Sequence, residues 1–142
     1  MEKSYRITLE EKPDSGDIQA LVKGLGDFNA SKTDGETPKY LLVAVRDGEG
    51  ALAGGLLGAS YLGWLQIQVV WLDEGARGHG YGSELMALAE QEGRRRGCLN
   101  SFVETLSFQA LPFYEKCGYT IFSRLADFPP GGARYALTKK LD

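Results

Sequence analysis

A glycine-rich turn between an apolar strand and a helix constrains the fold of this chain more than any other feature of its sequence. Residues 77–82 read RGHGYG and follow the expected strand 64–72. Alternating glycines let successive backbone N–H groups point into one concavity. The following helix adds its unpaired N-terminal donors and the positive end of its dipole. We therefore expect an anion cradle here that suits a pyrophosphate.

Two common nucleotide-binding loops fit this turn poorly. No lysine follows the glycines as in a Walker A loop, and the spacing lacks the third glycine of a dinucleotide fingerprint. A nucleotide-binding protein is therefore a remote alternative. The other alternative is a tight strand-to-helix connection that binds nothing.

The order of the expected elements indicates an α/β domain with a mixed sheet. Residues rich in strand formers predict strands at 4–9, 40–46, 51–61, 64–72, 99–106, 119–125 and 133–139. Helices are expected from Asp14 or Ser15, from the glycine turn to about Arg96, and over 109–116. Neither repeats nor a linker divide the sequence, so we expect a single domain over residues 1–142.

Three regions of this plan depend on weaker signals. In the first helix, one face carries Ile18, Leu21, Val22 and Leu25. Residues 26–38 are polar and punctuated, which predicts a loop or a short, broken helix. The basic residues 94–96 complement the dipole at the end of the long helix, and we expect them to be solvated.

Composition excludes several classes of function. A net charge of −3 argues against a nucleic-acid partner. One histidine and two cysteines, Cys98 and Cys117, predict neither a disulfide framework nor a metal site. The polar N-terminus does not resemble a signal peptide, and no apolar run approaches the roughly 20 residues of a membrane span. We expect a cytoplasmic protein with no membrane partner.

Two motifs give the chain a family resemblance. An apolar strand end followed by Arg77-x-x-Gly80-x-Gly82 resembles the cofactor motif of GNAT acyltransferases. Downstream, residues 110–119 (ALPFYEKCGY) resemble the family's second signature, and the two motifs stand at the expected separation. The resemblance covers residues 51–119. It implies a GNAT fold, with flanking helices and a central sheet in which two parallel strands splay apart.

The resemblance also implies where acetyl-CoA, the co-substrate, would bind. Its pantetheine would pair with the backbone of the strand before the turn, and its pyrophosphate would lie on the amides of residues 78–83. Many relatives carry an asparagine that contacts the cofactor where this chain has a serine. The implied cofactor-binding residues are Val70, Trp71, Leu72, Arg77, Gly78, His79, Gly80, Tyr81, Gly82, Ser83 and Ser107. No metal is implied.

Two residues are candidates for proton transfer. Tyr114 matches the family tyrosine that protonates the departing thiolate, and its alternative role is packing. In some family members a glutamate acts as the general base at the position where this chain has Gln66. The amide of Gln66 cannot accept a proton. Glu104 is the best remaining carboxylate, with a surface or structural role as its alternative.

The implied activity is transfer of an acetyl group to a primary amine of a small molecule or protein. Aromatic and polar residues near the expected cleft are candidates for the acceptor pocket, or else ordinary packing residues: Phe28, Asn29, Trp64, Gln66, Gln68, Phe102 and Phe108. The alternative function is a non-catalytic module that binds acyl-CoA. An antiparallel C-terminal sheet edge also makes a homodimer a reasonable expectation.

Overall fold

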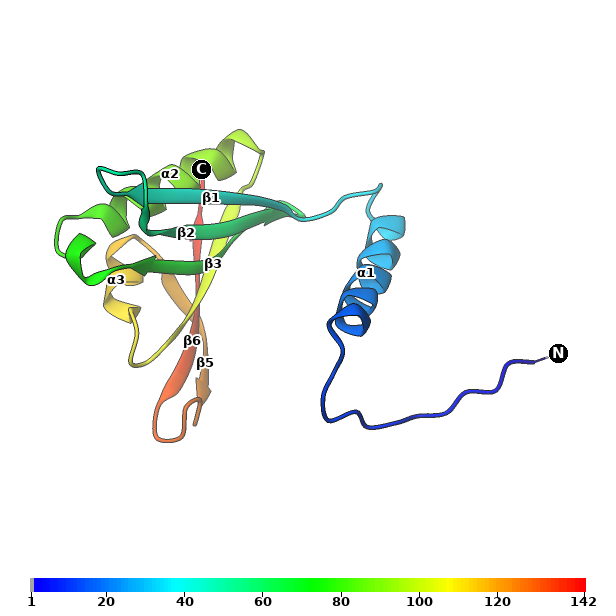
Figure 1. Cartoon of the computed structure of the whole chain (residues 1–142). Coiled ribbons are helices and arrows are strands. Elements are labelled where there is room, and N and C mark those ends of the chain that lie inside the picture. The colour runs from blue at the N-terminus through cyan, green and yellow to red at the C-terminus, as the bar shows by residue number, and fades with distance from the viewer. Residues whose placement is uncertain (1) are drawn as a thin grey trace. The chain divides into compact units, whose positions relative to one another are not determined.

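The computed structural model describes residues 2–142 and divides the chain into two compact units (Figure 1). The first unit ends at Thr37 and the second comprises Pro38–Asp142. In the first unit, helix α1 spans Ser15–Lys32. The Asp14 carboxylate caps it by accepting hydrogen bonds from the N–H groups of Gly16 and Asp17. The expectation that one domain spans residues 1–142 stays a prediction.

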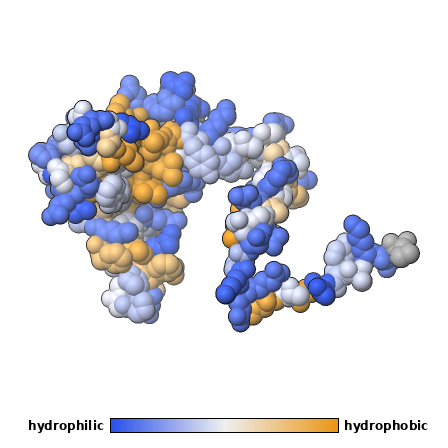
Figure 2. Space-filling view, in the orientation of Figure 1, coloured by the Kyte–Doolittle hydropathy of each residue, from blue (hydrophilic) through white to orange (hydrophobic). Residues whose placement is uncertain are grey.

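Two expectations for this first unit are wrong. Residues 4–9 form no strand, and the side chains of Tyr5, Ile7 and Leu9 are exposed. A strand needs a neighbour for its backbone hydrogen bonds, and the described part of this unit contains no second strand. A loop or a short, broken helix was expected at 26–38, but residues 26–32 continue helix α1 without a break. The glycines at 24 and 26 lower the stability of this helix without ending it. No residue of α1 is buried, and hydrophobic side chains of this helix are visible at its surface (Figure 2).

The second unit is a six-stranded mixed sheet with the order β1-β2-β3-β4-β6-β5. Its strands are β1 (Lys39–Arg46), β2 (Leu52–Tyr61), β3 (Trp64–Leu72), β4 (Asn100–Leu106), β5 (Thr120–Ala126) and β6 (Ala133–Lys140). All neighbours are antiparallel except β3 and β4, which run parallel. These bounds lie within two residues of the expected strands.

Helix α2 (Tyr81–Arg95) crosses from β3 to β4 and covers one face of the sheet (Figure 1). Its apolar stripe of Leu85, Met86 and Ala89 is buried. The core opposite this stripe includes Leu65 and Ile67 of β3, which alternate with exposed positions as a half-buried strand requires. The remaining helical elements are the short 3-10 helix η1 (Glu74–Ala76) and α3 (Leu111–Lys116).

The basic end of α2 is more structured than the sequence suggested. Arg95 is exposed and pairs with Glu92, but Arg96 is only partly exposed and bonds to the start of β1. Arg94 donates a hydrogen bond to the backbone oxygen of Leu141. The expectation of a wholly solvated helix end is therefore wrong, because two of these three guanidinium groups satisfy backbone oxygens from other elements.

Candidate active site

The two parallel strands separate halfway along their length. Pairing between β3 and β4 runs from Trp64 opposite Asn100 to Ile67 opposite Val103 and then stops. In β3, Gln68 is an extra residue that forms a bulge against β2, and beyond it the strand pairs with β2 alone. The β4-facing side of residues 69–72 therefore has no strand partner. This is the splay that the family resemblance implied.

A cleft of about 870 Å³ lies at this splay. Five segments contribute to it: the end of β3, the glycine turn with the start of α2, the end of β4, the loop after β4, and α3. The residues that line it are Gln68, Val69, Val70, Trp71, Leu72, Arg77, Gly82, Glu104, Thr105, Phe108, Gln109, Ala110, Phe113 and Tyr114. The structure thus brings together candidate residues that lie far apart in the sequence.

The glycine turn presents a row of free backbone donors. The N–H groups of residues 78–83 form no hydrogen bond with any of residues 2–142. Gly78 and Gly80 have φ values of 79° and 80°, which only glycine adopts readily. Gly80 is also the residue before the first turn of α2, and no side chain caps that helix. These donors lie at the positive end of the α2 dipole, which is an arrangement that can bind an anion.

Arg77 stabilises the strand end beside the turn. Its Nε donates a hydrogen bond of 3.0 Å to the backbone oxygen of Leu72. His79 is exposed, and its ring lies 5.6 Å from the Tyr81 ring. Tyr81 and Ser83 contribute backbone amides to the turn but do not line the cleft.

Tyr114 reaches the cleft from α3 and is only 6% exposed. Its ring packs edge-on against Phe113 and Tyr119. Burial is the main cause that raises the pKa of its phenol, and Cys117 adds to the effect. The hydroxyl forms no hydrogen bond with the rest of the described chain. The phenol therefore stays protonated at neutral pH and is available to a ligand in the cleft.

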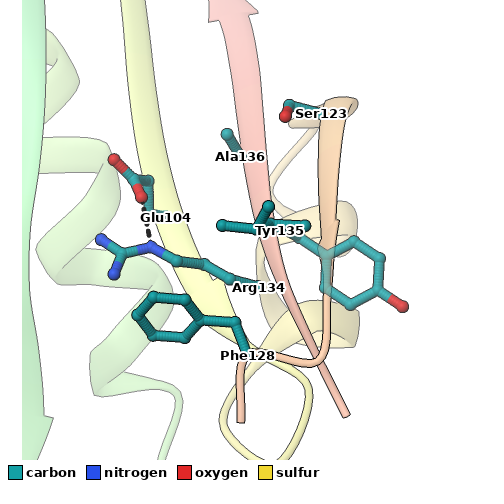
Figure 3. A pocket seen from close by; sticks show the side chains of 7 residues that line it. Glu104, Ser123, Phe128, Arg134, Tyr135 and Ala136 are labelled. Carbon is teal, nitrogen blue, oxygen red and sulfur yellow. Dashed lines mark hydrogen bonds and ion pairs between the residues drawn. The ribbon is translucent and has the colours of Figure 1, made fainter. Parts of the chain in front are cut away.

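Glu104 lies where the cleft meets three smaller cavities. These have volumes of about 260, 190 and 230 Å³, and each is lined by Glu104 and Arg134. The two side chains form an ion pair between β4 and β6 (Figure 3). Gln66, Gln68 and Phe102 line the cavity of 230 Å³. Trp64 makes an edge-on contact with Phe102, with ring centroids 6.0 Å apart.

Of the two remaining predicted residues in the loop after β4, Phe108 lines the cleft and Ser107 does not. The Ser107 hydroxyl accepts a hydrogen bond of 3.1 Å from the backbone N–H of Ala133, so it supports the loop between β5 and β6. Phe28 and Asn29 belong to α1 in the first unit, and their place in an acceptor pocket stays a prediction. Phe108 lines the cleft and is exposed.

Sequence reasoning missed several residues of this site. Arg134 gave no signal, because its pairing with Glu104 depends on the register between two strands 30 positions apart. Gln109 closes the loop after β4, where its side chain accepts a hydrogen bond of 2.8 Å from the N–H of Leu106. Gln109 was expected to begin the short helix at 109–116, but α3 begins at Leu111 and Gln109 lies in the loop before it.

Across residues 2–142, no group of three or more His, Cys, Asp or Glu side chains could hold a metal ion. None of the helices in that range is long and apolar enough to span a membrane.

Comparison with known proteins gives consistent matches. The model of the Acetyltransferase (GNAT) family matches residues 4–119. Blasticidin-S acetyltransferase of Streptomyces morookaense is 46% identical over 93 residues, which cover 65% of this chain and 68% of that enzyme. An acetyltransferase of Agrobacterium fabrum is 30% identical over 134 residues, covering 94% of this chain and 98% of the relative. The crystal structure of an Agrobacterium tumefaciens protein assigned as an acetyltransferase has a TM-score of 0.88 at 30% identity, covering 96% and 99% of the two chains.

Proposed function

Because this chain belongs to the GNAT family of acetyltransferases, we propose that it transfers an acetyl group from acetyl-CoA to a primary amine of a small molecule or a protein. Family membership confirms the expected α/β fold with its splayed parallel strands, and it makes the chain an acetyltransferase. The co-substrate and the acceptor are the parts that we propose. The observation that carries the proposal is the row of six free amides beside the unpaired edge of β3.

The residues of the cleft fit acetyl-CoA. A pyrophosphate needs several hydrogen-bond donors and positive potential, which the amides of residues 78–83 and the N-terminus of α2 offer together. A pantetheine arm carries amides that can pair with a free strand edge, and residues 69–72 leave that edge open. One solved neighbour, assigned as a streptothricin acetyltransferase of Bacillus anthracis, is a complex with acetyl-CoA and shares this fold with a TM-score of 0.66.

The chain's own groups would bind and orient the two reactants and would move the protons. A bound acetyl thioester supplies the activated acetyl group. Tyr114 holds a proton on its phenol in the cleft, where it can protonate a leaving thiolate. Glu104 borders both the cleft and the smaller cavities, so its carboxylate can accept a proton from an amine between them. Orientation of the two reactants in one cleft supplies the rest of the acceleration.

A module that binds acyl-CoA without catalysis was the alternative. The named acetyltransferases among the relatives favour the enzyme, and so does the accessible phenol of Tyr114. The absence of a carboxylate at Gln66 does not restore the alternative, because Glu104 lies at the same cleft. Names among the relatives also support an amine acceptor, since blasticidin-S acetyltransferase is the most similar of those described above.

The proposal is tested by calorimetric titration of the purified protein with acetyl-CoA, followed by thiol detection over a panel of amines. We expect saturable binding of acetyl-CoA and release of free thiol that depends on the amine. Binding of acetyl-CoA without thiol release for any amine would indicate a module that binds acyl-CoA without catalysis. No binding of acetyl-CoA would overturn the proposal, and the turn at residues 77–82 would then be a structural connection.

A further inference from the structure

The ion pair between Glu104 and Arg134 has an open side. Glu104 lies opposite Ala136 in the pairing of β4 with β6, and Arg134 is two residues from Ala136 along β6. The two side chains therefore share one face of the sheet as diagonal neighbours. The hydrogen bond runs from Nε of Arg134 to Oε2 of Glu104. The two terminal guanidinium nitrogens lie beyond the Nε that contacts Glu104 (Figure 3), and they donate no hydrogen bond to any side chain that the structure describes.

The guanidinium is held in place by a second contact. It lies over the ring of Phe128, with 5.1 Å between the guanidinium carbon and the ring centroid. Phe128 comes from the loop between β5 and β6, so Arg134 is fixed from two directions (Figure 3). A cation over an aromatic face is stabilised and loses side-chain freedom. The free edge of the guanidinium is thus preorganised as a fork of N–H donors.

The cavities place this fork beside the cleft of the proposed acetyl transfer. Glu104 lines the large cleft and all three smaller cavities, whereas Arg134 lines only the smaller ones. An acceptor whose amine lies beside Glu104 at the cleft would extend the rest of its structure along Arg134. The nearby wall includes Leu125 and Phe128, which are apolar.

We propose that the acceptor of this enzyme carries a carboxylate as well as its primary amine, and that Arg134 binds that carboxylate. The inference rests on the proposed function, since it names the substrate class of the same site. The amine would lie by the free oxygen of Glu104 and the carboxylate on the terminal nitrogens of Arg134. A planar fork of two parallel N–H donors matches a carboxylate in a bidentate manner. A neutral or purely cationic amine would leave this fork without a partner.

The test compares matched ligands by calorimetry on the protein saturated with CoA. The probes are 4-aminobutanoate and 6-aminohexanoate, each beside its own carboxamide. We expect at least one acid to bind about tenfold or more tightly than its amide. Arg134→Gln should remove this preference while leaving the affinity for the amide within about twofold. Arg134→Lys should restore part of the preference, because it keeps the charge and loses the fork.

Arg124→Gln is the matched control. Arg124 lies on the neighbouring strand over the ring of Tyr135, and it lines none of the four cavities described above. This variant loses the same charge and should keep the preference for the acid. Equal affinity of the wild-type protein for acid and amide would overturn the inference, and so would an equal loss in the two variants.

The same samples separate this inference from the proposed function. If acetyl-CoA binds and the carboxamide probes are acetylated as fast as the corresponding acids, the proposed function stands and the inference fails. If acetyl-CoA does not bind, the proposed function fails and the inference fails with it. Acetylation that favours the acids and loses that preference in Arg134→Gln supports both.

Discussion

Arg96 at the end of α2 donates a hydrogen bond of 2.8 Å to the backbone oxygen of Lys39, 57 positions earlier in the chain. The same guanidinium reaches the Ser60 hydroxyl at 3.1 Å and the backbone oxygen of Tyr40 at 3.2 Å. Lys39 and Ser60 are register partners at the ends of β1 and β2. One side chain therefore fixes the end of the crossover helix to the edge of the sheet. This helix begins at the glycine turn, so its position sets the position of the turn.

Replacing Arg96 should destabilise the fold. Arg96→Gln removes hydrogen bonds from a charged donor to three partners outside α2, and we expect a loss of about 1–3 kcal/mol in the free energy of unfolding. Arg95→Gln is the control, because Arg95 is exposed and pairs with Glu92 on its own helix. It should leave the stability unchanged. Urea denaturation of both variants measures the difference, and equal stabilities would contradict the role given to Arg96.

Tyr119 belongs to a buried polar network behind the active site. Its hydroxyl lies 3.0 Å from the carboxylate of Glu90 and 2.8 Å from the hydroxyl of Ser101. Lys139 completes the network with a bond of 2.7 Å to Glu90. Burial is the main cause that raises the pKa of Tyr119 far above its usual range, and the charge of Glu90 acts in the same direction.

The raised pKa predicts a loss of stability in alkali. Below pH 10 the phenol is neutral in both the folded and the unfolded chain, so it adds no pH dependence. Above pH 10 it ionises more readily in the unfolded chain, and the free energy of unfolding should fall as the pH rises. Tyr119→Phe should be less stable at pH 7, by about 1–3 kcal/mol, and should show a shallower decline above pH 10.

Urea denaturation between pH 7 and 11 tests this prediction. Tyr40→Phe is the control, because Tyr40 is exposed on β1. It should decline with pH as the wild-type protein does. If Tyr119→Phe declines just as steeply, the alkaline loss comes from other groups.

Gly80 should be indispensable for the cofactor. Gly80→Val forces a β-branched residue into a left-handed conformation, which costs about 1–2 kcal/mol and reorients the amides of the turn. We expect acetyl-CoA to bind at least about tenfold more weakly, since each lost amide bond to the pyrophosphate is a bond to a charged group. Calorimetry measures the affinity.

Gly24→Ala provides the comparison for this glycine. Gly24 lies within α1, its φ is not positive, and an added methyl group would meet no atom within 4 Å. The affinity for acetyl-CoA should not change in this variant. Unchanged affinity in Gly80→Val as well would remove the turn from the cofactor site.

Loss of the Tyr114 hydroxyl should lower turnover more than it lowers the affinity for acetyl-CoA. Tyr114→Phe keeps the buried ring against Phe113 and removes only the phenol oxygen. If the phenol protonates the leaving thiolate, kcat should fall by roughly 100-fold or more, and the affinity for acetyl-CoA should stay within about twofold. Steady-state kinetics with thiol detection gives kcat, and calorimetry gives the affinity. A fall in affinity with kcat retained would make Tyr114 a binding residue.

The elements that were predicted correctly are those encoded by residues adjacent in the chain. The candidate anion site was predicted from a strand, a glycine turn and a helix that are adjacent in the chain. The structure has each of these three elements in place. The hairpins and the bounds of α2 followed for the same reason. The strand at 4–9 failed because alternation shows which side chains share a face and not whether a partner strand is available.

The smaller cavities could not be foreseen, because they depend on contacts between distant residues. Glu104 and Arg134 meet through the register of β4 with β6, and no local pattern encodes that register. Arg96 was expected to be solvated for a similar reason, since its acceptors lie on β1 and β2. The homodimer also stays a prediction. Strand β5 is an edge of the sheet with exposed Phe122, which is compatible with pairing to a second copy.

The role of Glu104 is open to a test by pH. An amine with a pKa near 10 is mostly protonated at pH 7 and must lose a proton before it can attack. If Glu104 accepts that proton, Glu104→Gln should lower kcat/KM by roughly 100-fold at pH 7. The loss should shrink as the pH approaches 10, because most of the amine is then already deprotonated. Glu115→Gln, on the exposed side of α3, should match the wild-type protein throughout. A loss in Glu104→Gln that stays constant from pH 7 to 10 would assign Glu104 to holding the substrate, with proton removal left to water.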